Sequence, residues 1–402
     1  MAIDGPRPPG LVQESAAAID PSAVFLPAVD HWMTRARFEL IRSLREHSLL
    51  IAVVAVYVAY GKLLPRWFGV ATAGADDLYS GFVFVLTGAA AAVFALCYAI
   101  HLKLVVKPAD YPAALKAAAF GRFLTLRRLC MALPVLLILP LFGATFTNLK
   151  VLIPVIAPFS WDPTLSEWDR LLHGGYHPWQ ILQPLLGYPY VTSFFNAVYH
   201  FWFFLAYGVI CWQIASSDRP RLRMQYLLTF VLVWAVIGTI AAMLLSSAGP
   251  VYFGRVTGLP DPYAPLMTYL HHASTVAPVP ALGVQNMLWN LYQSQGMAVG
   301  GGISAMPSLH VAIAFSYVLL GAAIDRRLAL AGGVFTALIL IGSVHLGWHY
   351  AIDGYFSILM TWLIWRAVGW LLDWSRVARW LRLAEDSPSP RGDRIPRLSA
   401  AS

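Results

Sequence analysis

The chain contains eight stretches of nearly continuous apolar residues, each long enough to cross a lipid bilayer. A transmembrane helix needs about 20 predominantly apolar residues. Polar segments separate most of these stretches and hold most of the charged side chains. The apolar stretches lie near residues 47–65, 80–102, 129–147, 191–213, 225–247, 306–324, 328–345 and 349–371. This pattern predicts an all-α, polytopic membrane bundle of about eight transmembrane helices.

The composition supports a membrane protein and excludes an ordinary soluble domain. Hydrophobic residues make up 58% of the chain and charged residues only 12%, whereas soluble domains carry about 25% charged residues. The net charge of +8 does not indicate nucleic acid binding, because the basic residues follow a membrane topology. We therefore expect the lipid bilayer as a partner, and no nucleic acid. Cys97, Cys130 and Cys211 show no metal-type spacing and are expected to be small core residues.

Lysine and arginine residues are distributed unequally between the two sets of loops that eight spans create. One set, counted with the C-terminal tail, holds 21 of the 28 basic residues. The opposite set holds only Lys62, Arg66, Lys150, Arg170 and Arg255. Cytoplasmic loops are the ones enriched in basic residues, so both termini are predicted to be cytoplasmic, in a plasma or inner membrane. The long segments 148–190 and 248–305 are then predicted to face outward.

The same patterns divide the chain into four parts. Residues 1–25 lack a signal-peptide pattern and are predicted to be a flexible tail. Residues 26–128 are predicted to hold an amphipathic helix and two additional spans. Residues 129–373 are expected to form a six-helix core, and the Pro-, Ser- and Arg-rich residues 374–402 a basic cytoplasmic tail.

A histidine and an aspartate four residues apart open the last apolar stretch, in the sequence HYAID. This spacing places His349 and Asp353 on one face of a helix. A carboxylate beside an imidazole fixes its tautomer, orients the ring and stabilises its cationic or phosphorylated form. A structural His–Asp pair is the alternative, but ionisable groups at membrane depth are costly and usually functional. We therefore predict that both residues are catalytic.

A second histidine opens the sixth apolar stretch, in the sequence AMPSLHVAIAF. Pro307 suits the first turn of a helix, whose dipole favours an anion, and Ser308 can add a hydroxyl donor. The glycine-rich sequence VGGGIS, residues 299–304, allows the backbone to approach a ligand closely. His310 lies two spans before His349, so the predicted topology places both at the outer face, where they can form one site.

These motifs resemble those of the type 2 phosphatidic acid phosphatase superfamily. PSLH is similar to the Pro-Ser-Gly-His motif of that family, and HYAID to the end of its motif Ser-Arg, five residues, His, three residues, Asp. KVLIPVIAP, from Lys150 to Pro158, resembles the first motif, Lys, six residues, Arg-Pro, with Ala157 at the arginine position. Leu309 and the sequences GWHYAID and WDRLLHGG look more like the inositol phosphorylceramide synthase-like branch. The resemblance covers roughly residues 129–373 and implies a six-helix lipid phosphatase or phosphotransferase core.

The resemblance also implies a mechanism without metal or cofactor at the outer membrane face. His349 would attack the phosphorus of a phosphate-containing lipid and form a phosphohistidine, with Asp353 stabilising the ring. His310 would protonate the departing oxygen and then activate water or an incoming hydroxyl. Hydrolysis and head-group transfer of the inositol phosphorylceramide synthase kind would use the same histidines, so both remain open.

The arginines with which the family binds phosphate are absent from their usual places. At the Ser-Arg positions of the third motif the chain has Gly342 and Ser343. Other cations on the outer side must then neutralise the phosphate. Four residues are predicted on these grounds to bind the substrate: Lys150, Ser308, Arg170 and Arg255. Asp169, next to Arg170 in WDRLLHGG, is expected to hold that arginine in position.

Two other kinds of function are compatible with parts of the sequence. His345, His349 and Asp353 form a stripe that could bind a metal, but the His-Glu-x-x-His pattern typical of zinc enzymes is absent, and no metal site is predicted. A transporter or flippase would be expected to show internal repeats and interrupted spans with charges near the membrane midplane. Neither feature is visible in the sequence. The histidines at 173, 177, 271 and 272 are expected to be loop residues.

Overall fold

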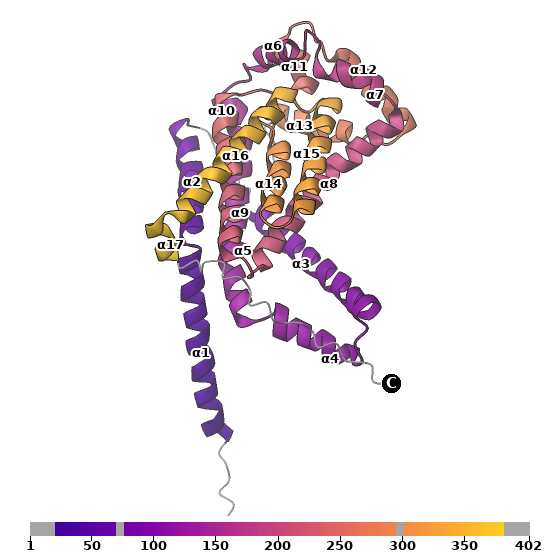
Figure 1. The fold of residues 1–402 in the computed structure, drawn as a ribbon. Coiled ribbons are helices and arrows are strands. Elements are labelled where there is room, and N and C mark those ends of the chain that lie inside the picture. The colour runs from indigo at the N-terminus through magenta and orange to yellow at the C-terminus, as the bar shows by residue number, and fades with distance from the viewer. Residues whose placement is uncertain (1–20, 70–75, 295–300, 382–402) are drawn as a thin grey trace, which may run out of the picture.

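The computed structural model describes residues 21–69, 76–294 and 301–381, and every secondary-structure element in these ranges is helical (Figure 1). The predicted all-α, polytopic bundle is confirmed. Most of the two predicted tails, residues 1–20 and 382–402, lies outside the described residues. Among the described residues, six helices are long and apolar enough to span a membrane: α2 (Ser48–Trp67), α5 (Leu126–Ile156), α8 (Pro189–Ala215), the continuous Pro220–Leu244, α15 (Arg326–His345) and α16 (Ala351–Asp373). The continuous helix consists of α9 (Pro220–Leu232), the π-helical η3 (Val233–Ala241) and α10 (Ala242–Leu244).

The other two predicted spans correspond to α3 (Asp76–His101) and α14 (Leu309–Ala322). The 14 residues of α14 rise only about 21 Å, less than the roughly 30 Å of a bilayer's hydrocarbon core. The eight residues before it, 301–308, are irregular and mostly buried. Such backbone is tolerated at membrane depth only where protein surrounds it. The sixth apolar stretch is therefore a buried loop followed by a short helix.

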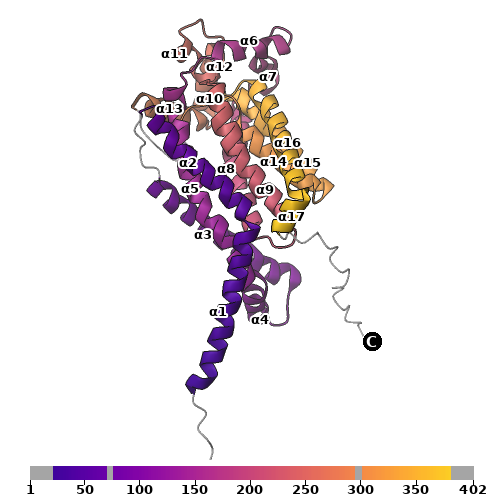
Figure 2. The same ribbon diagram turned by 90° about the vertical axis from the view of Figure 1, so that its left-hand side faces the viewer.

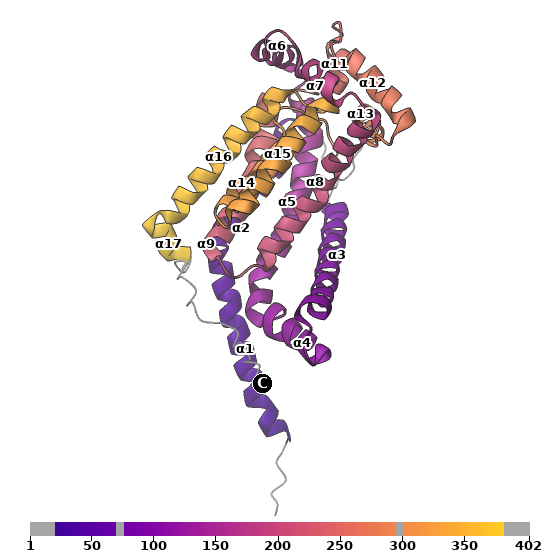
Figure 3. The same ribbon diagram turned by 45° about the vertical axis from the view of Figure 1, so that its right-hand side comes forward.

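Helix α14 lies between α15, α16 and α9 (Figure 3). Two glycines allow α14 and α15 to form a tight antiparallel pair. A Cβ atom on Gly332 would lie 2.9 Å from the nitrogen of Val318, and one on Gly321 would lie 2.6 Å from the nitrogen of Ala329. Small residues permit such close backbone contact between membrane helices. The pairing fixes α14, which carries His310, against the rest of the bundle.

The two ends of the bundle differ. At one end, short helices from the two segments predicted to face outward form what we call the cap (Figure 1). The cap comprises α6 (Asp162–Leu172), α7 (Pro178–Leu186), α11 (Phe253–Thr257), α12 (Ala264–Val276) and α13 (Ala281–Ser294). At the other end, α1 (Pro21–Glu46) continues α2 and extends beyond the bundle (Figure 2). It begins inside the segment expected to be a flexible tail, while α4 (Tyr111–Lys116) and α17 (Ser375–Leu381) lie at the same end.

A buried arginine joins three helices near the end opposite the cap. Arg223 of α9 is only 2% exposed and donates to the carbonyl oxygens of Gln213, Ile214 and Met131 at 2.7, 3.3 and 3.2 Å. It also donates to Nε2 of His47, the residue before α2, at 2.7 Å. A buried cation needs such complete hydrogen bonding. We name Arg223 and these four partners the Arg223 cluster.

Candidate active site

A histidine and an aspartate are in hydrogen-bonding contact at the start of α16. His349 Nδ1 lies 3.2 Å from Asp353 Oδ2, and the Tyr350 N–H donates to the same oxygen at 3.1 Å. The sequence spacing suggested that both lie in one helix, but α16 begins at Ala351, so His349 belongs to the preceding loop. The Asp353 carboxyl is fully buried. Because a carboxylate accepts from Nδ1–H, the lone pair of the His349 imidazole is on Nε2.

His310 is the second residue of α14 and is enclosed by aromatic side chains of α8. Tyr199 stacks on its imidazole with the ring centroids 4.5 Å apart, and Trp202 and Phe203 lie at 4.3 and 5.8 Å. The indole N–H of Trp202 also donates to the His310 carbonyl oxygen at 3.0 Å. The rings fix the orientation of the imidazole.

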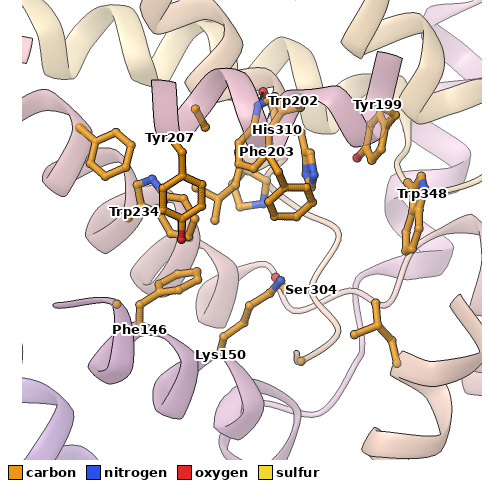
Figure 4. Close-up of a pocket in the computed structure, with 18 of the residues that line it drawn as sticks. Phe146, Lys150, Tyr199, Trp202, Phe203, Tyr207, Trp234, Ser304, His310 and Trp348 are labelled. Carbon is orange, nitrogen blue, oxygen red and sulfur yellow. Dashed lines mark hydrogen bonds between the residues drawn. The ribbon is translucent and has the colours of Figure 1, made fainter. Parts of the chain in front are cut away.

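The two histidines face one cavity of about 310 Å³. Their ring centroids are 6.4 Å apart. The segments that carry them are joined because the N–H of Ser308, just before α14, donates to the carbonyl oxygen of Asp353 in the first turn of α16 at 3.4 Å. Lys150 of α5 enters from the wall opposite His310 (Figure 4). The lining of the cavity therefore includes both of these imidazoles and one ammonium group.

Of the three predicted cations, the structure brings one to the histidines. Lys150 is the single lysine or arginine among the described residues that line the cavity. Arg170 forms two 2.8 Å hydrogen bonds with Glu167 on the exposed face of α6, which lowers the pKa of the Glu167 carboxyl. Arg255 lies over the ring of Trp289 at 5.2 Å and does not line the cavity.

Two motif positions hold buried small residues that do not line the cavity. Ser308 is fully buried, and its hydroxyl oxygen caps α14 by accepting the N–H of Val311 at 3.5 Å. Its predicted role as a donor to substrate is therefore not supported by its position. Ser343 is equally buried and donates to the carbonyl oxygen of Leu340 at 2.8 Å. A side chain as large as arginine at Ser343 would have to displace its neighbours.

Two buried aspartates of α6 hold the segment that carries His349. Asp169 accepts the N–H groups of Ala351 and Ile352, the first residues of α16, at 2.9 and 3.1 Å. A carboxylate at this position satisfies free N–H groups and complements the helix dipole. Asp169 therefore caps α16. The sequence had suggested a different role, in which Asp169 holds Arg170 in position.

The second aspartate, Asp162, is seven residues before Asp169 and lies on the same helix face. It accepts the N–H groups of Ala248 and Gly249 at 2.9 and 2.8 Å and the Tyr350 hydroxyl at 2.9 Å. Burial raises the pKa of both carboxyls, and these hydrogen bonds act in the opposite direction. We call Asp162, Asp169 and their five donors the α6 clamp.

A short segment after α10, residues 246–249, connects both histidine loops, and we call it the junction segment. The carbonyl oxygen of Ser247 accepts the N–H of Ala305 at 2.9 Å. Gly249 has a φ of +94°, and a Cβ atom there would lie 2.7 Å from the carbonyl oxygen of Trp348. A larger residue would push the junction segment away from the loop that carries the catalytic histidine candidate.

Several residues of the site belong to no motif that the sequence analysis singled out. The aromatic wall around His310 comes from YHFWFF, residues 199–204. The high proportion of aromatic residues in this run is the sequence feature that could have pointed to it. His200 also lines the cavity, and its Nδ1–H donates to the carbonyl oxygen of Asn196 at 2.8 Å. Asp162 precedes a proline at the start of α6, a common helix-start pattern with no sign of its distant partners.

The alternative metal stripe does not converge on one point. His345 does not line the cavity, and its Nε2 lies 2.9 Å from Thr192 Oγ1, so it faces α8 rather than the His349–Asp353 pair. Within the part of the chain that the structure describes, no group of three potential ligands is arranged to hold a metal ion.

Asp162→Ala should strongly destabilise the protein. It removes the acceptor of three buried donors, and each unsatisfied buried donor costs about 1–3 kcal/mol. We expect the free energy of unfolding to fall by about 3 kcal/mol or more, measured from denaturant midpoints and melting temperature in one detergent. Glu167→Ala, on the exposed face of the same helix, is the matched control and should cost less than about 1 kcal/mol. Equal losses in the two variants would contradict the clamp.

Comparison with known proteins identifies the family of this chain. A sequence profile of the PAP2 superfamily matches residues 163–367, about half of the chain. The matched range includes His310, His349 and Asp353 and begins after Lys150. The match does not distinguish the inositol phosphorylceramide synthase-like branch from the rest of the superfamily. No curated protein and no solved structure gives a significant match. The family match and the two motifs that meet at one cavity lead to the same conclusion: the chain belongs to the PAP2 superfamily, the type 2 phosphatidic acid phosphatases.

Proposed function

We propose that the protein cleaves or transfers the phosphate ester of a lipid through a phosphohistidine intermediate. The observation that carries the proposal is the His349–Asp353 pair, which shares one cavity with His310. His349 Nε2 attacks phosphorus, the bond to the leaving oxygen breaks, and protonated His310 gives its proton to that oxygen. Asp353 stabilises the positive charge on the phosphorylated ring. Neutral His310 then takes a proton from water or an acceptor hydroxyl, whose oxygen attacks phosphorus and releases His349.

Neutral donors support the phosphate beside Lys150, the one lysine or arginine that lines the cavity in the described part of the chain. The Tyr199 hydroxyl and the Trp348 indole N–H are buried without a hydrogen-bond partner among the described residues, and both side chains line the cavity. A buried donor without a partner costs free energy, which a bound phosphate oxygen would recover. Fixed donors of this kind stabilise the charge that develops during phosphoryl transfer.

The walls of the cavity and the charge distribution support a lipid substrate at the outer face. Below the histidines the cavity is lined by apolar side chains of α5 and α8, including Phe146 and Ile210, as expected for a hydrocarbon-containing ligand. The bias of basic residues toward the end opposite the cap supports a cap that faces outward, in a plasma or inner membrane.

Head-group transfer of the inositol phosphorylceramide synthase kind is the alternative to hydrolysis. The same histidines serve both reactions, because only the attacking hydroxyl differs. Product analysis with candidate phospholipids, with and without an alcohol acceptor, separates the two. Vanadate, which mimics the pentacoordinate phosphoryl group, should inhibit either reaction, whereas a transporter need not respond.

His349→Ala and His310→Ala should each abolish turnover of lipid phosphates while the melting temperature changes little. Asp353→Asn should retain a small residual rate, because Asp353 orients the nucleophile and does not react itself. Phosphate release and product formation measure the effect. Substantial activity in His349→Ala would exclude the phosphohistidine mechanism.

Lys150→Ala should lower kcat/KM at least tenfold, about 1.4 kcal/mol of transition-state stabilisation. Its ammonium group is the one side-chain cation at the cavity in the described part of the chain. Arg170→Ala is the control for loss of an outer-face cation and should stay within about twofold, because Arg170 is paired with Glu167 at the surface. Similar losses in both variants would show that Arg170 reaches the substrate after all.

Single cysteines should reveal the orientation of the bundle. In a background without native cysteines, Tyr176→Cys and Leu259→Cys should react with a membrane-impermeant thiol reagent in intact cells, because both positions are exposed on the cap side. Asp218→Cys, between α8 and α9 with an 82% exposed side chain, should react only after permeabilisation. Labelling of Asp218→Cys alone would place the site on the cytoplasmic side.

A further inference from the structure

The cavity continues from the histidines along one face of α5 and one face of α8. On each helix the lining residues recur every three or four positions, which is the spacing of a single helix face. On α5 they are Leu136, Leu139, Phe142, Phe146 and Lys150. On α8 they include Tyr199, Trp202, Ala206, Ile210 and Ile214, and a third side is formed by Phe230 and Trp234.

Both helices give the same depth for this extension. Lys150 to Leu136 is 14 residues and Tyr199 to Ile214 is 15, so at 1.5 Å per residue the cavity extends about 21 Å from the histidine level. Over that length mostly apolar side chains line it on three sides, as expected for a site that holds a hydrocarbon chain.

The Arg223 cluster closes the inner end of the extension. Ile214 is the last α8 residue of the lining, and its carbonyl oxygen accepts a hydrogen bond from Arg223 at 3.3 Å. The carbonyl oxygen of its neighbour Gln213 accepts another at 2.7 Å. On the other wall Met131, just beyond Leu136 on α5, accepts from the same guanidinium at 3.2 Å. A ligand that went deeper would have to separate a buried cation from its partners, which is strongly unfavourable.

We propose that this extension is a channel for a hydrocarbon chain of the substrate, and that its depth sets an upper limit on the length of that chain. The proposal rests on the proposed function and names its substrate class: the phosphate ester of a lipid whose hydrocarbon chain enters the channel. A chain that leaves the bilayer for the channel gains little hydrophobic free energy, because both surroundings are apolar. The channel therefore affects which chain lengths are accepted more than how tightly the lipid binds. A chain longer than about 21 Å must buckle or hold its phosphate away from the histidines.

Native Cys211 lines the channel and lies 12 residues, about 18 Å, from Tyr199 along α8. In a full-length variant with Cys97→Ser and Cys130→Ser, the rate of its alkylation by N-ethylmaleimide reports whether that depth is filled. n-Octadecyl phosphonate should slow the reaction at least fivefold, whereas n-octyl phosphonate, whose chain ends well short of Cys211, should leave it unchanged. Equal protection by the two, or none by the octadecyl compound, would overturn the channel. Phosphonates are not cleaved, so this result is independent of catalysis.

A matched pair of tryptophan variants tests the limit on chain length. Leu136→Trp fills the inner end of the channel, and Leu137→Trp places the same ring on the exposed side of α5, where Leu137 is 56% exposed. For Leu136→Trp, kcat/KM for n-octadecyl phosphate should fall at least fivefold, while that for n-octyl phosphate stays within twofold. Leu137→Trp should change neither. Parallel losses for both chain lengths would overturn the limit. If the unaltered protein cleaves neither phosphate, the proposed function fails, and the alkylation experiment still decides on the channel.

Discussion

The site depends on satisfying the backbone polar groups of three irregular segments that meet inside a helical membrane bundle. Hydrocarbon offers these groups no partner, and each one left unsatisfied costs several kcal/mol. The junction segment therefore binds residues 301–308 through the Ser247 carbonyl oxygen and the Ala305 N–H, and the nearby Val251 N–H donates to the Gly347 carbonyl oxygen. Asp162 supplies acceptors for the N–H groups of Ala248 and Gly249. Both histidines are carried by or next to segments that this hydrogen bonding fixes. The positions of the two histidines therefore follow from the hydrogen bonding of backbone N–H and C=O groups as much as from side-chain packing.

The same constraint explains why, among the described residues, one lysine and no arginine lines the cavity. Arg223 shows what a buried guanidinium requires in this bundle, namely four acceptors at once. Acceptors of this kind around the histidines would compete with phosphate for the guanidinium and would make the hydrocarbon channel polar. Neutral donors such as the Tyr199 hydroxyl and the Trp348 indole N–H avoid this conflict, because leaving them unpaired costs less than leaving a buried charge unpaired.

The helical bundle and the common location of the two histidines could be predicted from sequence, because they follow from the number and length of the apolar runs. Apolar runs of sufficient length specify spans, and an even number of spans between His310 and His349 returns the chain to the same side of the membrane. The short α14 was not accessible, because the apolar stretch that begins at Met306 gives no sign that the helix itself covers only Leu309–Ala322. The role of Asp169 depends on N–H groups more than 180 residues away, which no local pattern reveals. The surface position of Arg170 was accessible, since Glu167 lies three residues before it on the same helix.

The N-terminal helices, expected from sequence to be an addition to a six-helix core, contact the wall and the inner end of the proposed channel. The hydroxyl of Tyr57 in α2 lies 2.7 Å from Thr239 Oγ1 in η3, a π-helical stretch of the kind often found at functional sites. In that stretch Gly238 lines the cavity, and a Cβ atom there would lie 2.7 Å from the Leu309 side chain. At the inner end, His47 accepts from Arg223. Residues before position 128 thus contact residues at two boundaries of the cavity, although its lining begins at Leu136 in the described part of the chain. The proposed limit on chain length therefore involves helices outside the range that the family profile matches.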